Sequence, residues 1–232
     1  MQFLESSVIG LRAARHRLTS PDHAAEVTLF PMVHVGEPAF FQQVYAEAGA
    51  HDIVLLEGVT SKTASNLTRA YRWMRVGRLG LVVQPAFDTA ETTAEVIRAD
   101  LSAEEFDALW QAIPVLERRL LAGLAPIFGV LRGLILSRRS LARNMNQEDL
   151  TTRDDLLIWG TPFTGHRRVL LEARDARLCA WVESVLQRSA KRPLRVAIVY
   201  GAAHMPQVLH CLRQGWRYVV VDSDWMTVFS ER

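Results

Sequence analysis

Short apolar runs, turns and amphipathic helices follow one another in the same order at both ends of the chain. Residues 26–34 are rich in β-branched and aromatic side chains, which predicts a strand, and Pro38 opens a helix that should end near Gly49. The almost continuous apolar run 52–57 then predicts a strand covered on both faces. We expect these elements to form a βαβ unit with parallel, neighbouring strands and a right-handed crossover.

A second unit of this kind is predicted near the C-terminus. Residues 194–200 predict a strand, a turn of small residues leads into a helix begun by Pro206 and stopped by Gly215, and residues 216–222 predict the last strand. Between the two units we expect short strands at 80–83 and 95–97, a helix introduced by the capping box of Ser102 and Glu105, a loop over 159–165 and a long helix over 166–189.

These elements and the size of the chain predict one α/β domain. A chain of 232 residues with 49% hydrophobic composition can bury one sizeable core. Strands that alternate with helices favour a mainly parallel β-sheet flanked by helices. We therefore expect residues 1–232 to form a single domain, with a mainly helical insertion or cap over about residues 103–165.

Charge and cysteine usage narrow the class of protein. Lys and Arg total 27 against 25 Asp and Glu, a net charge of +2, and no segment concentrates the excess as nucleic-acid binders usually do. Cys179 and Cys211 lack CxxC spacing, so we expect neither a zinc knuckle nor a redox pair and interpret both as small buried hydrophobes. The first residues lack the apolar core of a secretory signal, which favours a cytoplasmic protein. We expect no nucleic-acid partner and no nucleotide cofactor, and the oligomeric state stays open.

The longest apolar run, residues 120–136, raises the question of membrane contact. Its length approaches that of a transmembrane helix, but Arg132, Pro126 and three glycines argue against one. Arginines flank the run on both sides, which suits a segment that lies on a membrane surface or packs on a partner. We favour a buried or half-buried helical hairpin broken near Pro126, because this composition fits soluble helices as well. Peripheral membrane contact through residues 114–139 is therefore kept as an alternative.

Three polar residues stand at the carboxyl ends of predicted strands: His34, Glu57 and His204. Ligands of parallel sheets bind at this end, because loops converge there and helix N-termini point inward. Two imidazoles and a carboxylate suit a divalent metal such as Mn, Co or Zn. They also suit metal-free acid–base chemistry, in which an imidazole takes a proton. Asp222 and Asp224 close the last predicted strand and could approach the same end, but we interpret them as surface or capping residues.

Arg174 is a further candidate on independent grounds. It lies four residues from both Leu170 and Leu178, on the apolar stripe of its predicted helix. An arginine there needs a carboxylate partner or a bound anion, unless it snorkels from the edge of the stripe. Glu57 is one candidate partner, and a substrate carboxylate or phosphate is another. Asp175 could orient one of the histidines or join a surface pair.

The stretch MVHVGEPAFFQQVYAEAGAHDIVLLEGV resembles the opening of the TraB/PrgY/GumN superfamily, which includes the Tiki metalloproteases and is related to erythromycin-esterase-like and ChaN-like proteins. In that superfamily a GxxH motif after the first core strand precedes a helix, a strand and a glutamate, and a second GxxH lies near the C-terminus. VYGAAHMP matches the second motif at Gly201 and His204. In the first, His34 and Glu57 are in place, but Pro31 stands where the glycine would be.

The resemblance also implies roles for residues elsewhere. EARDARLCAWVESVL is similar to the family helix that bears an arginine followed by Asn or Asp, here Arg174 and Asp175. LVVQPAF and VIRADLSAEEF look like the middle strands of a bacterial branch and imply that Gln84 and Asp100 lie near the site. The resemblance implies an α/β fold and, as in the Tiki branch, divalent-metal-dependent peptide-bond cleavage.

These observations favour a hydrolase that acts on a small molecule or a peptide. In the leading hypothesis His34, Glu57 and His204 bind a divalent metal or directly activate water, while Arg174 steadies the substrate or the developing oxyanion. The second hypothesis is a metal-free His/Glu esterase. The third is a non-catalytic regulatory or binding protein that associates peripherally with a membrane.

Overall fold

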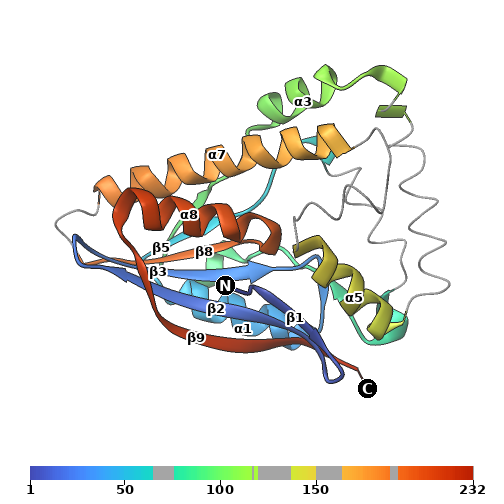
Figure 1. Cartoon of the computed structure of the whole chain (residues 1–232), viewed down its shortest axis with the longest axis horizontal. Coiled ribbons are helices and arrows are strands. Elements are labelled where there is room, and N and C mark those ends of the chain that lie inside the picture. The colour runs from blue at the N-terminus through green and yellow to red at the C-terminus, as the bar shows by residue number, and fades with distance from the viewer. Residues whose placement is uncertain (65–75, 117, 120–136, 150–163, 189–192, 232) are drawn as a thin grey trace.

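A seven-stranded mixed sheet with helices on both faces forms the centre of the molecule (Figure 1). The computed structural model describes residues 1–64, 76–116, 118–119, 137–149, 164–188 and 193–231. The strands of this sheet are β1 (Leu4–Ser7), β2 (Gly10–Ser20), β3 (His23–Met32), β5 (Ile53–Leu56), β7 (Glu95–Arg98), β8 (Arg195–Gly201) and β9 (Val219–Ser230). The α/β fold expected from the sequence is confirmed.

Helices and short elements complete the described structure. The α-helices are α1 (Pro38–Gly49), α3 (Ala103–Ala112), α5 (Arg138–Asp149), α7 (Thr164–Arg188) and α8 (Met205–Trp216). Two short strands, β4 (Val35–Gly36) and β6 (Val82–Val83), pair with each other in a separate antiparallel ribbon. The 3₁₀ helices are η1 (Val76–Leu79), η2 (Thr89–Glu91) and η3 (Ala202–His204). The capping box of Ser102 and Glu105 is present at the start of α3.

The strand order corrects one expectation about the site. The main path of the sheet is β1-β2-β3-β8-β5-β7, and β9 pairs with β2. Strands β3, β8, β5 and β7 are parallel, so β3 and β5 share a direction, but β8 lies between them and the expected adjacency is wrong. The reason is the apolar character of β8, whose residues 196–200 are all buried and which pairs on both edges. The strand that leads to His204 is therefore central.

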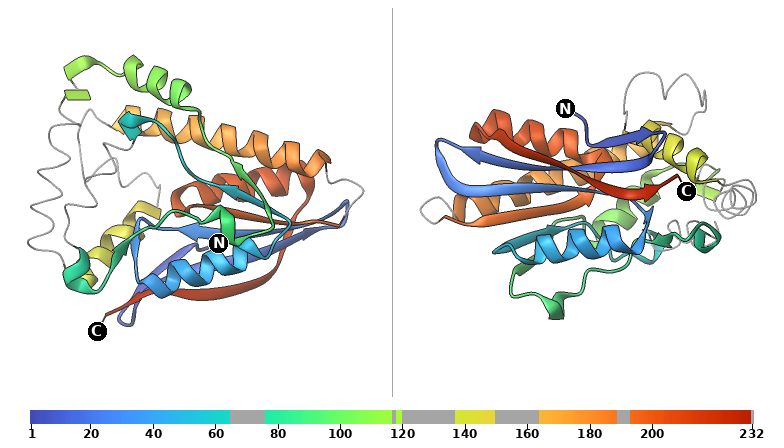
Figure 2. Two further views of the ribbon diagram at one scale, coloured as in Figure 1. Left: turned by 180° about the vertical axis from the view of Figure 1, so that it is seen from behind. Right: turned by 90° about the horizontal axis from the view of Figure 1, so that it is seen from below.

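Each face of the parallel strands packs against its own helices (Figures 1 and 2). Along β8, Ala197 and Val199 join the core that contains α1, whereas Val196, Ile198 and Tyr200 join the core that contains α7 and α8. This alternation follows from the two-residue period of a strand. The side chains at the carboxyl end of the sheet therefore face α7 and α8 at every second position.

The antiparallel half of the sheet differs most from the sequence prediction. Strands β1 and β2 were not expected, and β9 continues to Ser230, well beyond the predicted end at residue 222. Asp222 and Asp224 therefore lie within β9 rather than at its end. Because β9 pairs with β2, both aspartates form ion pairs with Arg15 of β2. They do not stand at the site, in agreement with their interpretation as surface residues.

Some predictions for the middle of the chain fall partly outside the described residues. The long helix α7 begins at Thr164, within the loop expected over 159–165, and residues 159–163 lie outside the described part. Of the expected helical insertion over residues 103–165, α3 and α5 are described, and 120–136 and 150–163 are not. In the part of the chain that the structure describes, no helix is long and apolar enough to cross a membrane.

The interpretation of the two cysteines as unpaired small hydrophobes is wrong. Cys179 on α7 and Cys211 on α8 form a disulfide, with a Cα–Cα distance of 6.3 Å. Residues 32 positions apart in sequence meet because both helices pack side by side on the same face of the sheet (Figure 1).

Candidate functional site

Arg174 joins two carboxylates that come from different strands. Its Nε and Nη2 donate to Asp100 Oδ1 and Oδ2 at 3.0 and 2.7 Å, and Nη2 also donates to Glu57 Oε1 at 2.5 Å. Glu57 follows β5 and Asp100 follows β7, so adjacent strand ends supply both acids. The two-residue period of β5 turns Glu57 to the face of Ile53 and Leu55, which is the α7 face.

The position of Arg174 on α7 explains why it reaches the sheet. It lies on one helical stripe with Leu178, Val182 and Val185, which are buried against the strands. Arginine is tolerated there because the carboxylates of Glu57 and Asp100 neutralise its charge. Of the partners considered from the sequence, Glu57 is the one that Arg174 binds in the described structure, and Asp100 is a second.

The second carboxylate oxygen of Glu57 binds a backbone N–H at the end of β8. Glu57 Oε2 accepts a hydrogen bond of 2.6 Å from the backbone N–H of Gly201. A side chain at Gly201 would crowd this contact, because a Cβ there would lie 3.0 Å from Oε2. Glycine therefore permits the close approach of the carboxylate to the backbone.

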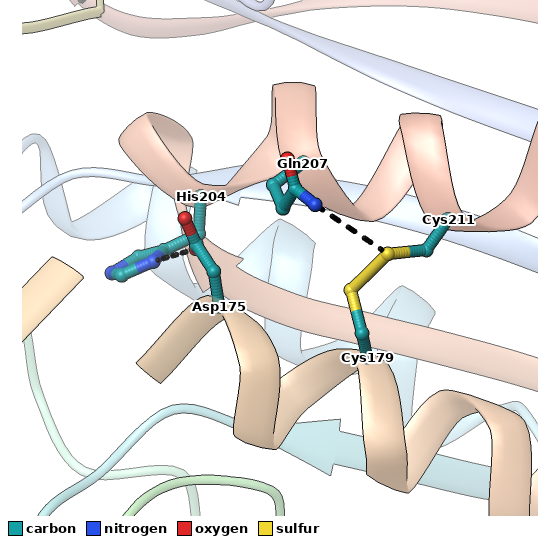
Figure 3. The surroundings of a disulfide bond; sticks show 5 residues. All are labelled: Asp175, Cys179, His204, Gln207 and Cys211. Atoms are coloured by element: carbon teal, nitrogen blue, oxygen red, sulfur yellow. Dashed lines mark hydrogen bonds and ion pairs between the residues drawn. A yellow bond between two sulfur atoms is a disulfide. The ribbon is translucent and has the colours of Figure 1, made fainter. Parts of the chain in front are cut away.

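His204 and Asp175 form a second pair beside the first. Asp175 Oδ1 lies 2.6 Å from His204 Nδ1, and both side chains are largely buried (Figure 3). Asp175 follows Arg174 on α7, whereas His204 ends η3 directly before α8. A carboxylate at Nδ1 favours the tautomer that carries its proton on Nδ1 and leaves Nε2 with a lone pair. The arrangement suits an imidazole that accepts a proton at Nε2.

Tyr200 packs between the two pairs and was missed by the sequence analysis. Its ring lies 5.5 Å from Arg174 Cζ and meets the His204 ring edge-on at 4.8 Å between centroids. Its hydroxyl is fully buried and makes no hydrogen bond of ordinary geometry among the described residues. Burial and the nearby negative charges of Asp100 and Glu57 raise the pKa of Tyr200, despite the opposing charge of Arg174. The ring therefore acts as a neutral spacer between Arg174 and His204.

The charges of the site keep both strand-end acids ionised. Burial alone would raise the pKa of Glu57, but the positive charge of Arg174 and its hydrogen bond, with electrostatic contributions from His204 and His34, outweigh burial and lower the pKa below its usual value. Burial likewise opposes ionisation of Asp100, and hydrogen bonds from Arg174 and the backbone of Leu101 and Gly58 lower its pKa overall. Arg174 responds in the opposite sense: burial would lower its pKa, and the two carboxylates raise it.

Two polar atoms of the site lack a hydrogen-bond partner in the described part of the chain. Within the residues that the structure describes, Arg174 Nη1 and His204 Nε2 make no hydrogen bond. Both groups flank the ring of Tyr200. The site thus offers one N–H donor with a positive charge and one nitrogen acceptor.

Two of the predicted site residues lie at its edge. His34 is exposed and follows β3, and it contributes electrostatically to the lowered pKa of Glu57. Gln84 lies beside it: the Gln84 N–H donates to the His34 carbonyl at 2.9 Å, and Gln84 Nε2 donates to Tyr45 Oη at 3.3 Å. Gln84 therefore binds α1 and the loop of His34 rather than the central acids.

The described side chains do not form a ready metal site. No group of three or more His, Cys, Asp or Glu residues with suitable geometry occurs in the described ranges. Of the three ligands expected from the sequence, Glu57 uses one oxygen for Arg174 and the other for Gly201. A positive guanidinium in contact with the carboxylate also opposes a cation there. The metal site expected from the sequence therefore stays a prediction.

Arg138, on the C-terminal flank of the proposed membrane segment, makes contacts within the folded chain. Residues 120–136 lie outside the described part, but Arg138 at the start of α5 is described and mostly buried. It pairs with Glu37 at 2.6 Å and donates to the carbonyl oxygens of Ser230 and Leu79. Arg138 is therefore not free to bind a membrane surface, whereas Arg139 is exposed.

Comparison with known proteins adds no relative: no protein-family model, curated protein or solved structure matches the chain. The resemblance to the TraB/PrgY/GumN superfamily thus stays a prediction, and the functional argument depends on the site itself.

Proposed function

We propose that this chain is a hydrolase in which His204, oriented by Asp175, transfers protons, and Arg174 stabilises negative charge. The observation that carries the proposal is the 2.6 Å contact between Asp175 Oδ1 and His204 Nδ1 beside an arginine whose Nη1 is unoccupied among the described residues. A base held by a third group next to an electrophilic donor is the arrangement that acyl-transfer chemistry requires.

In this proposal water is the nucleophile. His204 Nε2 accepts a proton from water as the water oxygen attacks the carbonyl carbon of an ester or amide. The carbonyl oxygen becomes negatively charged, and Arg174 Nη1 donates a hydrogen bond to it. His204 then returns its proton to the leaving oxygen or nitrogen as the tetrahedral intermediate collapses.

Glu57 and Asp100 hold the arginine in this scheme and do not take part in proton transfer. Both oxygens of Glu57 already accept hydrogen bonds, and Asp100 accepts bonds from Arg174, Gly58 and Leu101. Their lowered pKa values keep both carboxylates charged near neutral pH, so the guanidinium remains fixed. The role of Glu57 thus differs from the general acid–base role that the sequence analysis left open.

A hydrolysis screen with a chelator arm tests the proposal. The purified full chain is assayed against chromogenic esters and peptide amides, with and without EDTA, alongside His204→Ala. We expect hydrolysis that EDTA leaves intact and that His204→Ala abolishes. Equal activity of His204→Ala and the parent chain would contradict the proposal.

The same assay decides between metal-free and metal-dependent chemistry. Loss of activity in EDTA and its return with Mn, Co or Zn would contradict the metal-free scheme and support the metal site of His34, Glu57 and His204. An Arg139→Ala variant serves as a matched control, because Arg139 is exposed and stands outside the site.

A further inference from the structure

The disulfide connects α7, which carries Asp175, to α8, which begins directly after His204 (Figure 3). Cys179 lies four residues after Asp175 on α7, which is about one turn or 6 Å along the axis. Cys211 lies on α8, seven residues after His204. The covalent bond therefore joins α7 to α8, and the Asp175–His204 hydrogen bond joins α7 to the turn that leads into α8.

The two cysteines of the disulfide are partly exposed. Cys179 and Cys211 are each half-buried, and the exposed Gln207 side chain donates to Cys211 Sγ at 3.8 Å. No other cysteine occurs in the sequence, so exchange within one chain has a single possible pairing. Access to a sulfur atom is one of the conditions for thiol–disulfide exchange.

Apolar packing holds the middle of α7, whereas its site-bearing turn is held by polar groups. Leu178, Val182 and Val185 are buried in the core shared with α8, so reduction would leave the helices in contact. One turn closer to the N-terminus, Arg174 binds the acids that follow β5 and β7 and lies over the Tyr200 ring, and Asp175 binds His204 on η3. Loss of the crosslink would thus act on the polar turn while the fold persists.

We propose that Cys179 and Cys211 are a reversible redox site that controls the proton-transfer pair. In the oxidised chain the crosslink holds Asp175 against His204. A dithiol reductant attacks the S–S bond through one thiolate, and its second thiol displaces the mixed disulfide. Both cysteines end as protonated thiols, and the reductant, which has given up two electrons and two protons, ends as an intramolecular disulfide. The regulatory part of this inference rests on the proposed hydrolase function.

The structural part is tested by redox titration of the full chain with oxidised and reduced dithiothreitol. Alkylation and mass spectrometry count free thiols, and hydrogen–deuterium exchange follows residues 171–180 and 202–207. We expect two thiols to appear together, with faster exchange in both segments and unchanged exchange in β3. Two free thiols before any reductant is added, or identical exchange in the two states, would overturn the inference.

The regulatory part is tested by activity. We expect reduction to lower kcat by roughly ten- to hundredfold, the range expected when a catalytic pair is misplaced by about 1 Å, and reoxidation to restore it. The double variant Cys179→Ala/Cys211→Ala should match the reduced chain and ignore dithiothreitol. Activity that is equal in the oxidised, reduced and double-variant forms would overturn the regulation while leaving the hydrolase proposal standing. If no hydrolysis is found at all, the exchange data still decide the structural part.

Discussion

At the scale of single residues, Arg174 is the centre of the site because it neutralises two acids that the fold buries. The Asp100 side chain is 1% exposed and that of Glu57 16%, so neither carboxylate has much water to replace a lost partner. Removing one member of a buried ion pair leaves an uncompensated charge, which costs far more than the pair contributes. Arg174 should therefore matter for stability as well as for chemistry.

Replacing Arg174 with glutamine should lower the free energy of unfolding by about 3–5 kcal/mol. Urea unfolding at neutral pH measures the change. The matched control is Arg177→Gln on the same helix, because Arg177 forms an exposed ion pair with Glu105 and should cost less than about 1 kcal/mol. Equal losses for the two variants would contradict the assigned role of Arg174.

The same two acids predict how stability depends on pH. Glutamate and aspartate side chains ordinarily titrate with pKa values of 4.5 and 3.8, and the folded chain lowers the pKa of both Glu57 and Asp100. A lowered pKa contributes stability that is present above the unfolded value and is lost as pH falls through the folded value. The difference in unfolding free energy between the parent chain and Arg174→Gln should therefore be largest near pH 7 and shrink below these ordinary values. A difference that is constant from about pH 7 to about pH 3 would contradict this account.

At the scale of elements, the turn from β8 into α8 assembles the site. In four residues it supplies the Gly201 N–H for Glu57 and the His204 ring for Asp175. The small residues before His204 predict this turn from the sequence and place His204 at the end of a strand. Tyr200 carries no such signal, because a tyrosine within an apolar strand has the same pattern as a packing residue.

Substituting Gly201 with alanine should disturb this turn. The added methyl group would lie 3.0 Å from Glu57 Oε2, so we expect a loss of about 1–3 kcal/mol in unfolding free energy and a lower kcat. Thermal unfolding and the hydrolysis assay measure the two effects. Gly215→Ala is the control, because a Cβ there meets nothing within 4 Å, and it should be neutral or slightly stabilising. Similar behaviour of the two variants would argue against the close approach at Gly201.

At the scale of the whole molecule, contacts between segments that are distant in sequence determine the strand order and the disulfide, which local sequence patterns do not predict. The apolar runs predicted β3, β5 and β8 well, because burial on both faces leaves a strong local signal. The order of these strands could not be predicted from local patterns, because β8, which is near the C-terminus of the chain, lies between β3 and β5. The disulfide was missed for the same reason, because nothing in the local sequence of Cys179 or Cys211 shows that their helices meet.

Arg138 connects three segments that are distant in sequence. It links α5 to Glu37 before α1 and to the backbone at the end of β9. We expect Arg138→Ala to lower the free energy of unfolding by about 2 kcal/mol or more, because hydrogen bonds to a charged group are lost. Arg139→Ala should change it by less than about 0.5 kcal/mol. If chemical unfolding gives equal values for both, the structural role of Arg138 is wrong.

The central claim is that Asp175 and His204 act as one proton-transfer unit, and a double-mutant cycle on kcat tests it most directly. Asp175→Asn should lower kcat by roughly 10²- to 10⁴-fold with KM little changed, because the imidazole loses its orientation and tautomer. His204→Ala should lower kcat at least as much. The account predicts that the double variant is no slower than His204→Ala alone. Effects that multiply in the double variant, or a single variant with full activity, would contradict the claim.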